Sequence, residues 1–308
     1  MTLSIVDLTE IRAVATEELV FTAVRDALVA HAEGRTQLPP PIALVFPEAG
    51  GDCHVKAGQL AGAPYFGVKV ATGFYRNAER GLPSNSGLIL VLDATTGVPA
   101  AVLADEGWLT AWRTAAAGAL VTHALTPPDV DEVGVLGTGL QARLQVEWLH
   151  ALRPLARVRI WGRRAEAARR VCDELSLAAR PATLEEAAGS ACVITATPST
   201  TPLAPASAFA GALHVTGIGT DLPGKGELPP SLFSGAVVVT DDHAQCLDHG
   251  DFGNAVRAGV VGSEVDVPAG VVLRDGVDRQ AGLTIADLTG LGVADAAVAS
   301  AVFTALSR

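Results

Sequence analysis

The spacing of apolar residues differs between the first and the second part of the chain. In the first part, apolar residues recur at near-helical spacing over residues 9–32 and again over 110–125, which predicts two helices, the second capped by Thr110. Between them, short apolar runs separated by turns rich in glycine and proline predict strands. The expected strands are 42–46, 53–57, 65–71, 87–93 and 99–103. Strands joined by such short turns indicate an antiparallel or mixed sheet.

In the second part the pattern becomes strand–helix–strand. The expected strands are 133–136, 158–161, 191–195, 213–217 and 237–240, with helical patterns such as 165–175 between most of them. This alternation predicts a parallel sheet joined by right-handed crossovers. Residues 283–291 are expected to form turns and a short strand or helix, and residues 295–306 an alanine-rich helix.

The predicted fold class is α/β, with two domains. Thr126-Pro127-Pro128-Asp129 is the natural linker, because consecutive prolines interrupt helices and strands alike. We expect a strand-rich mixed α/β domain over residues 1–126, completed by a C-terminal helix over 291–308. A Rossmann-type parallel-sheet domain is expected over 127–290.

The composition describes a packed globular protein without affinity for polyanions. Of the 308 residues, 49% are hydrophobic and 18% charged, and no apolar run is long enough to span a bilayer. The formal net charge of −11 argues against nucleic acid or an anionic membrane as a partner. The N-terminus lacks the pattern of a signal peptide, and the four cysteines are widely spaced. A reduced, cytoplasmic protein is expected.

A glycine-rich turn follows the first expected strand of the second part. Gly137-Thr-Gly139-Leu-Gln-Ala142 fits the G-x-G-x-x-A fingerprint of dinucleotide-binding folds and leads into a helical pattern. Gly137 allows a tight turn, Gly139 lets the backbone approach a pyrophosphate, and Ala142 permits close packing of helix and strand. The helix N-terminus offers unpaired N–H groups to the phosphates. An ordinary strand-to-helix turn is the less favoured alternative.

A second glycine pair, Gly217-Ile-Gly219, does not lead into a helix. Asp221-Leu-Pro223 comes next, so that no helix can start cleanly. We interpret this segment as a loop at a strand end, which is where ligands lie in open parallel sheets.

The end of the second strand of this domain bears on the choice of cofactor. A free ribose 2′-hydroxyl is usually bound by an acid about 20 residues after the glycines. Here the strand ends in Gly162-Arg163-Arg164 instead. Arginine binds phosphate through a fork, and it is unfavourable at a helix start without an anion. The sequence therefore favours NADP(H), with NAD(H) as the alternative.

Six segments fall in order along nearly the whole chain. They are Phe66-Gly-Val-Lys69-Val, Leu109-Thr-Ala-Trp-Arg113-Thr114-Ala-Ala, Gly137-Thr-Gly-Leu-Gln141-Ala142, Thr195-Ala-Thr197-Pro-Ser-Thr, Gly219-Thr-Asp221-Leu-Pro-Gly-Lys225-Gly-Glu227-Leu and Gly290-Leu-Gly-Val-Ala-Asp295. Together they resemble the ornithine cyclodeaminase/μ-crystallin family, which contains cyclodeaminases, ketimine reductases, alanine dehydrogenases and a hormone-binding member. The resemblance implies that the first domain binds substrate and forms a homodimer.

The resemblance also implies roles for three residues. Lys69 and Arg113 match the residues that hold a substrate carboxylate beside the nicotinamide, and Asp221 matches a carboxylate that moves protons as catalytic acid and base. An ammonium in the apolar pattern around Lys69 needs an anion nearby, and Arg113 lies in the first turn of a helix. The alternatives are a structural salt bridge for Lys69, a surface position for Arg113 and a role in the turn for Asp221.

Weaker matches complete the candidate site. The residues expected to bind the cofactor are Gly137, Thr138, Gly139, Leu140, Gln141, Arg163, Arg164, Thr197 and Ser84. The residues expected at the substrate are Lys69, Arg113, Asp221 and Thr289.

Two features complicate this interpretation of the sequence. The family usually has an arginine after two prolines, whereas this chain has Pro41-Ile42; Arg35 or Lys56 are the nearby candidates to replace it. A cluster of acids and histidines over 241–251 lacks any standard ligand spacing, so we interpret it as a solvated helix and expect no metal.

The sequence predicts an NAD(P)-dependent enzyme that acts at the C–N bond of an α-amino or imino acid. Two reactions fit, namely reduction of a cyclic imine or ketimine and a redox-neutral deaminating cyclisation of the ornithine type. The paired arginines and the missing proline-adjacent arginine favour reduction. The alternatives are an amino-acid oxidoreductase of the alanine dehydrogenase type and a non-catalytic protein that binds a small ligand.

Overall fold

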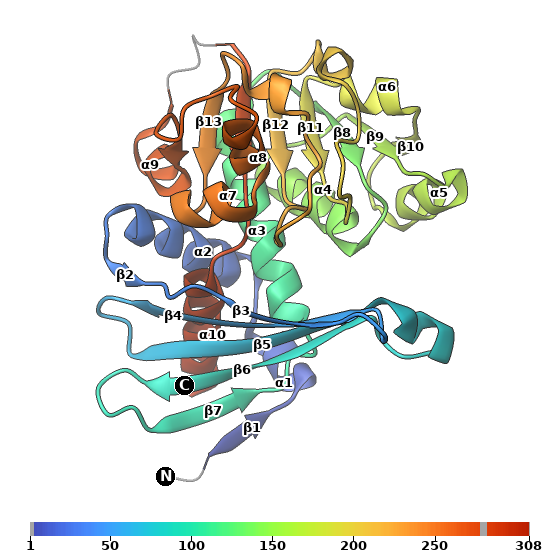
Figure 1. Cartoon of the computed structure of the whole chain (residues 1–308). Helices are drawn as coiled ribbons and strands as arrows, with labels where there is room; N and C mark the ends of the chain where they lie inside the picture. The colour runs from blue at the N-terminus through green and yellow to red at the C-terminus, as the bar shows by residue number, and fades with distance from the viewer. Residues whose placement is uncertain (1–2, 278–281, 308) are drawn as a thin grey trace. The chain divides into compact units, whose positions relative to one another are not determined.

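The computed structural model describes residues 3–277 and 282–307, and the chain forms two compact units (Figure 1). The first unit is Met1–Arg113 with Leu291–Arg308, and the second is Thr114–Gly290. The division falls inside helix α3 (Trp108–Leu125), and the boundary predicted after residue 126 lies just past the end of this helix.

A seven-stranded sheet forms the centre of the first unit. The strand order is β1-β7-β6-β5-β4-β2, and β3 also pairs with β4. β1 runs parallel to β7 and the other pairs are antiparallel. The strands are β1 (Ser4–Val6), β2 (Thr36–Gln37), β3 (Ile42–Phe46), β4 (Gly51–Leu60), β5 (Tyr65–Phe74), β6 (Asn85–Asp93) and β7 (Pro99–Leu103).

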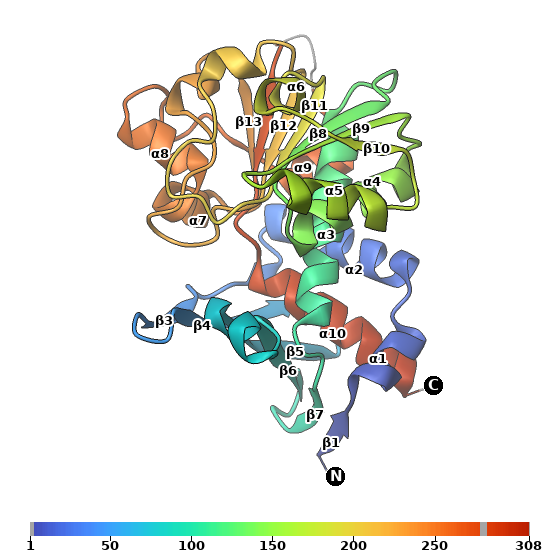
Figure 2. The ribbon, with the colours of Figure 1, turned by 90° about the vertical axis from the view of Figure 1, so that its right-hand side faces the viewer.

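This unit also contains helices. They include α1 (Leu8–Val14), α2 (Glu17–Ala32), the 3₁₀ helix η1 (Tyr75–Arg80) and α10 (Gly292–Leu306). α10 packs against β4, β5 and α2, so a segment from the far end of the chain completes the core of the first unit (Figure 2).

Two helix predictions in this unit are corrected. Residues 9–32 form two helices and not one, because Thr16 leaves the helical conformation and its side chain accepts the N–H of Leu19, which starts α2. Thr110 lies inside α3 and does not cap it. At that end Asp105 accepts the N–H of Leu109 at 2.9 Å.

The second unit is built on an eight-stranded sheet in which every recorded pair is parallel. The order is β10-β9-β8-β11-β12-β15-β13-β14. The strands are β8 (Glu132–Leu136), β9 (Arg157–Trp161), β10 (Ala179–Pro181), β11 (Cys192–Thr195), β12 (His214–Gly217), β13 (Val237–Thr240), β14 (Val267–Pro268) and β15 (Thr284–Asp287). This order reverses between β8 and β11, as in Rossmann-type folds, and the predicted fold class is confirmed.

Helices alternate with these strands. They are α4 (Leu140–Leu152), α5 (Ala165–Glu174), α6 (Leu184–Ala188), η2 (Ala206–Phe209), η3 (Pro230–Phe233), α7 (His243–His249), α8 (Asp251–Arg257) and α9 (Ala269–Asp275). α4 packs on β8 and β11, and α6 on β8 and β9. Within the described ranges, no helix is both long and apolar enough to cross a membrane.

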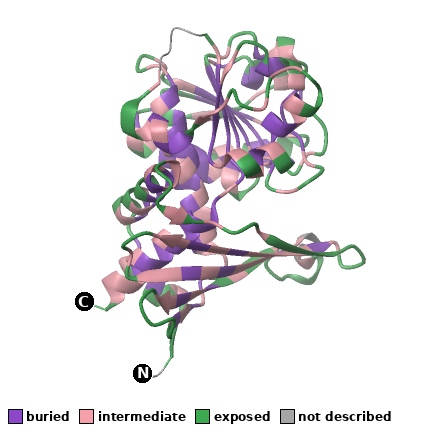
Figure 3. Ribbon diagram, turned by 60° about the vertical axis from the view of Figure 1, so that its left-hand side comes forward, coloured by how far each residue is buried: buried purple, intermediate pink, exposed green. Residues whose placement is uncertain are grey.

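The core of the second unit lies along its strands, where buried residues are concentrated (Figure 3). β8, β11 and β12 are buried almost throughout, because a parallel sheet covered on both faces needs apolar strands. At Gly134 a Cβ would lie 1.9 Å from the carbonyl oxygen of Ala187 in α6. Glycine therefore sets the close approach of α6 to β8.

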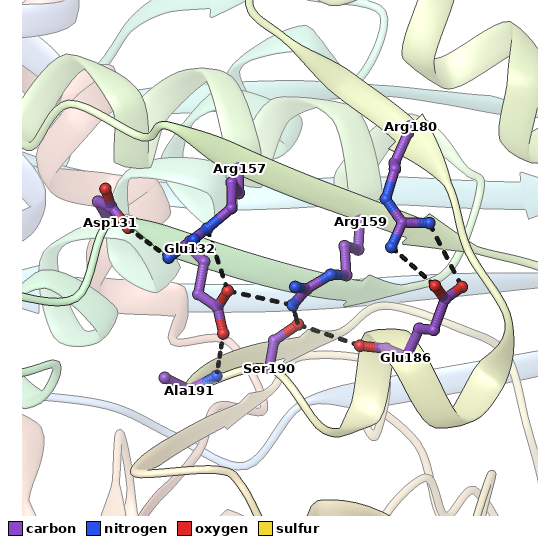
Figure 4. A network of polar contacts seen from close by, with 8 residues as sticks. All are labelled: Asp131, Glu132, Arg157, Arg159, Arg180, Glu186, Ser190 and Ala191. Carbon is purple, nitrogen blue, oxygen red and sulfur yellow. Dashed lines mark hydrogen bonds and ion pairs between the residues drawn. The ribbon is translucent and has the colours of Figure 1, made fainter.

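Ion pairs tie the elements together toward the amino ends of these strands (Figure 4). Glu132 at the start of β8 lies 3.3 Å from Arg157 and 3.2 Å from Arg159, both of β9. Arg180 of β10 pairs with Glu186 of α6 at 2.7 Å. The glycine-rich turn after β8 lies at the opposite, carboxyl ends, so this network fixes strand packing away from that turn.

Candidate functional site

The turn between β8 and α4 has the geometry of a phosphate cradle. Gly137 is buried with φ of 149°, and a Cβ there would lie 2.4 Å from the carbonyl oxygen of Ala196. Gly139 is exposed, and a Cβ there would meet no atom within 4 Å. Gly139 is also the N-cap of α4, so the first N–H groups of this 13-residue helix have no side-chain cap. This arrangement fits a pyrophosphate.

The residues around this turn pack as the fingerprint predicts. Ala142 is fully buried in α4, whereas Leu140 is 49% exposed. Thr138 fits because a glycine follows the neighbouring strand β9, and a Cβ on Gly162 would lie 2.3 Å from the Thr138 Cγ2. Gln141 in the first turn of α4 accepts the side-chain N–H of Gln145 at 3.3 Å.

Arg163 and Arg164 come directly after Gly162. Both are exposed, and Arg164 is the N-cap of α5 without making a side-chain cap bond. No acid stands at the tip of β9, which ends at Trp161. Two exposed guanidinium groups therefore lie one strand away from the glycine turn, at the same edge of the sheet.

Glu227 joins the ends of β11 and β12. It is fully buried and accepts the backbone N–H and hydroxyl of Thr197 at 2.6 and 2.7 Å, the Thr195 hydroxyl at 2.8 Å and the Gly219 N–H at 2.8 Å. The Thr197 hydroxyl, which was expected to touch the cofactor, thus donates to Glu227. Burial raises the pKa of Glu227 to about 7, although these hydrogen bonds act to lower it. In the sequence Glu227 belongs to a family segment, but nothing there indicated a role for it.

More buried acids lie along the same edge. Asp251 accepts the Glu227 N–H at 3.0 Å, and burial, together with the charge of Glu227, raises the pKa of Asp251. Burial and then the charge of Asp251 raise the pKa of Asp287 as well. Asp241 accepts the N–H and the hydroxyl of Thr289, each at 3.0 Å. Thr289 is therefore a buried strand-end residue fixed by Asp241.

The acidic segment over 241–251 is not the solvated helix that the sequence indicated. Asp241, His249 and Asp251 are buried, and the carboxylates of Asp241 and Asp251 accept the backbone N–H groups of Gly290 and Glu227. Among the residues that the structure describes, no group of three or more histidines, cysteines and acids is arranged to hold a metal ion.

Asp221 lies in the loop after β12. Its side chain is 50% exposed and pairs with Lys225 at 2.5 Å. The loop contains no helix up to η3, as the proline after Asp221 predicted. Asp221, Thr197, Thr289 and the glycine turn all come after the carboxyl ends of parallel strands, which lie at one edge of a sheet.

In the first unit, Lys69 and Arg113 meet at one carboxylate. Lys69 Nζ lies 2.7 Å from Oδ2 of Asp295, and Arg113 Nε lies 2.7 Å from Oδ1. The side chains of all three are at most 7% exposed. The ion pair that was an alternative for Lys69 is present, and Arg113 is buried and not on the surface. No role for Asp295 was expected from the sequence, although it is the only charged residue of α10.

A third basic residue lies beside this cluster. Lys56 of β4 is 8% exposed and is the direct cross-strand partner of Lys69. Burial lowers the pKa of Lys69 to about 7; the charge of Asp295 opposes this effect, while those of Arg113 and Lys56 add to it. The pKa of Asp295 is lowered because Arg113 and Lys69 outweigh its burial. Three basic side chains thus lie around one carboxylate, and their charges favour its ionised form.

The structure also places three other residues that the sequence singled out. Arg35 is half-exposed and pairs with Glu33, so Lys56 and not Arg35 lies at the cluster. Ser84 lies before β6, where its carbonyl accepts the Phe74 N–H at 2.7 Å. Pro41 precedes β3, in a segment that is half-buried to exposed.

A parallel α/β sheet with a glycine turn that leads into an uncapped helix is the architecture of a dinucleotide-binding protein. The profile of the Ornithine cyclodeaminase/mu-crystallin family matches residues 3–308. The chain belongs to this family, as its segments predicted.

Named relatives extend over almost the full chain. The alanine dehydrogenase of Archaeoglobus fulgidus is 33% identical over 307 residues, which cover 97% of this chain and 94% of the relative. The iminosuccinate reductase of Paracoccus denitrificans is 30% identical and covers 95% of this chain and 93% of its own. A crystal structure of that reductase in complex with NAD+ matches with a TM-score of 0.90 and 27% identity, covering 99% and 96% of the two chains. The predicted class of enzyme is confirmed.

Proposed function

We propose that the protein reduces the C=N bond of an imino acid with a nicotinamide cofactor. The observation that carries the proposal is the pair of buried cations, Lys69 and Arg113, which converge on one carboxylate in an otherwise apolar setting. Buried cations of this kind bind the carboxylate that every amino and imino acid carries. Relatives named as an alanine dehydrogenase and an iminosuccinate reductase support a reaction at the carbon–nitrogen bond.

The second unit fits the cofactor. The exposed Gly139 and the uncapped start of α4 suit the pyrophosphate, and Gly137 and Gly162 make room for the turn. Arg163 and Arg164 suit a 2′-phosphate, so we propose a preference for NADP(H) over NAD(H). Thr197 and Ser84 remain proposed cofactor contacts.

The chain's own residues supply binding and proton transfer. Arg113 bonds Asp295 through Nε, so its other donors can serve a substrate carboxylate beside Lys69. When bound, the nicotinamide supplies the hydride that adds to the carbon of the C=N bond. Asp221 gives a proton to the nitrogen and regains one from water, which completes the amine. Thr289, fixed by Asp241, is proposed to line the substrate position.

We also propose a cytoplasmic homodimer. The four cysteines are free, which suits a reducing compartment. In β3, Ile42, Leu44, Val45 and Phe46 are each at least 41% exposed, although the strand is apolar throughout. An exposed apolar edge strand of this kind is normally covered by a partner, and a second copy of the chain suits it.

The test is a cofactor titration and then a turnover assay. We expect fluorescence titration to give tighter binding of NADPH than of NADH, and a panel of imino acids to oxidise NADPH. Asp221→Asn should lower kcat about 100-fold with little change in NADPH affinity. Glu264→Gln, which alters an acid with 86% side-chain exposure, is the matched control and should behave as the parent.

Each opposite result contradicts one part of the proposal. Ammonia release from ornithine without net cofactor oxidation would make the protein a cyclodeaminase. Replacing Arg163 and Arg164 by serine should weaken NADPH binding at least about tenfold and leave NADH binding unchanged. If the parent binds NADH more tightly, the role given to these arginines is wrong.

A further inference from the structure

The loop that carries Asp221 is buried near both of its ends. It runs from Gly219, after β12, to Glu227, and Asp221 lies in the more exposed part between them. Thr220 at its start is fully buried, and its hydroxyl donates to Oδ1 of Asp287 at 3.1 Å. Glu227 at its end is fully buried as well. The place of Asp221 therefore depends on how these two buried ends are held.

The side chain of Glu227 joins the two ends of this loop. Its Oε2 accepts the N–H of Gly219 at 2.8 Å, so the last residue of the loop is bonded to the first. Its Oε1 accepts the N–H of Thr197 at 2.6 Å, which ties the loop to the segment after β11. The N–H of Glu227 donates to Asp251 in α8 at 3.0 Å. One buried residue thus fixes the loop to two further segments of the second unit.

The glycine at position 219 is explained by this contact. A Cβ there would lie 2.5 Å from the carboxyl carbon of Glu227 and 2.2 Å from the carbonyl oxygen of Thr197. The φ of Gly219 lies outside the left-handed region that favours glycine. The close approach of Glu227, and not the backbone conformation, therefore excludes a side chain at this position.

Each oxygen of Glu227 faces a backbone N–H group, which can only donate. The hydroxyls of Thr195 and Thr197 also contact the two oxygens, and a hydroxyl can donate or accept. Since burial raises the pKa of Glu227 to about 7, both of its forms occur near neutral pH, and in the protonated form the proton can bond to a hydroxyl. A glutamine amide has the same shape, but its NH2 group would face one of the two N–H groups. Glu227→Gln therefore breaks one of the two backbone contacts at nearly constant volume.

We infer that Glu227 is a positioning residue, which joins the ends of the 219–227 loop and so holds Asp221 where it can give a proton to the substrate nitrogen. The inference rests on the proposed function, in which Asp221 is the proton donor. Because Glu227 is fully buried, it acts on the reaction through the loop. A displacement of about 1 Å at a catalytic group can lower a rate about 100-fold, so a loop that is loosened at one end should lower kcat.

A double-mutant cycle with Asp221 tests this role. At saturating NADPH and saturating imino acid (the member of the panel that the parent reduces fastest), kcat per folded protein is measured for the parent, Glu227→Gln, Asp221→Asn and the double variant. We expect Glu227→Gln to lower kcat at least about tenfold in the parent and less than about twofold in Asp221→Asn, because the group that the loop positions is then already lost. Equal losses in both backgrounds would overturn the inference.

A second measurement needs neither substrate nor cofactor. In Glu227→Gln, hydrogen exchange of the Gly219 N–H, followed by mass spectrometry, should be at least about tenfold faster than in the parent. Glu132→Gln is the matched control, because Glu132 also accepts a backbone N–H, that of Ala191, but at the opposite edge of the sheet. It should leave both kcat and the exchange of Gly219 as in the parent. Unchanged exchange in Glu227→Gln would show that this residue does not hold the loop.

A milder variant serves if Glu227→Gln does not fold. Thr195→Val removes one donor to Glu227 at nearly the same volume, and it should lower kcat about threefold in the parent but not in Asp221→Asn. A parent that reduces no imine, or an Asp221→Asn protein with the kcat of the parent, would instead refute the proposed function. The exchange of Gly219 would still decide whether Glu227 joins the ends of the loop.

Discussion

Asp295 links the two cations on which substrate binding is proposed to depend. It is 2% exposed and bonds Lys69 and Arg113 through separate oxygens. A carboxylate in this position keeps both cations ordered, and its charge partly opposes the lowering of the Lys69 pKa by burial. The residue is therefore a positioning group whose loss affects both folding and anion binding.

Replacement of Asp295 by asparagine should destabilise the protein by about 3 kcal/mol, because it leaves buried cations without their anion. Thermal unfolding measures this loss. Added succinate should raise the melting temperature of Asp295→Asn more than that of the parent, since an external carboxylate can take the vacated place. Asp131→Asn is the control, because Asp131 and its partner Arg157 are more than half exposed and such pairs contribute less than about 1 kcal/mol. Equal stability of Asp295→Asn and the parent would contradict this role.

The cations could be found from the sequence, but their partner could not. Lys69 and Arg113 stand out as charges in apolar surroundings, whereas Asp295 comes 182 residues or more after them and could be paired with them only through the fold. Glu227 was missed for the same reason, since its partners lie on three different segments. The signal available for Asp295 was its position as the only charge in α10.

At the scale of elements, the two glycines of the β8–α4 turn have different roles, one in folding and one in ligand binding. Gly137 is needed by the fold itself, because both its φ and the nearby Ala196 carbonyl exclude a side chain. Gly139 has normal φ and open space around it, so that its lack of a side chain serves a ligand that approaches the helix N-terminus.

The two glycines should therefore respond differently to alanine. Gly139→Ala should leave urea unfolding within about 0.5 kcal/mol of the parent and raise the Kd for NADPH at least about tenfold, since a methyl group blocks the phosphate. Gly137→Ala should destabilise the protein by about 2 kcal/mol or more through strain and overpacking. If Gly139→Ala binds NADPH as the parent does, the pyrophosphate does not lie at this turn.

Local pattern was enough to place most elements. β3, β7 and β13 have the predicted bounds, because turn residues mark both of their ends. The position of β15 between β12 and β13 was not predictable, since strand order depends on packing of distant segments. The break at Thr16 was missed because apolar spacing continues across it, although threonine followed by two glutamates is a helix-start signal.

At the scale of the whole molecule, β3 should mediate the proposed dimer. Val45→Lys places a charge on its apolar surface, where Val45 is 68% exposed, and should weaken dimerisation at least about 100-fold. Analytical ultracentrifugation of parent and variant measures the change. Val265→Lys replaces a valine that is 48% exposed on the second unit and should leave the oligomeric state unchanged. A parent that sediments as a monomer would refute the dimer.

The buried acids predict an unusual dependence of stability on pH. The pKa of Glu227 is raised from 4.5 to about 7, so the folded protein keeps a proton that the unfolded chain has lost over this range. The free energy of unfolding should therefore fall as pH rises from about 5 to about 7, by about 1.4 kcal/mol per pH unit for each such proton. Urea unfolding across this range tests the sign. Asp251→Asn should make the free energy of unfolding depend less on pH, because it removes one buried acid and its repulsion of Glu227. If the free energy of unfolding of the parent rises over this interval, the acids are ionised in the folded protein.

The return of α10 to the first unit determines the order in which the chain can fold during synthesis. Residues 1–113 leave the ribosome first, but the helix that completes their core is made only after the whole of residues 114–290. The parallel-sheet unit can thus reach its final packing while the sheet of the first unit still has an uncovered apolar face. Chaperones that bind exposed apolar strands have their longest opportunity at that stage, and a ribosome that stalls before residue 291 releases a chain with one finished unit and one unfinished one.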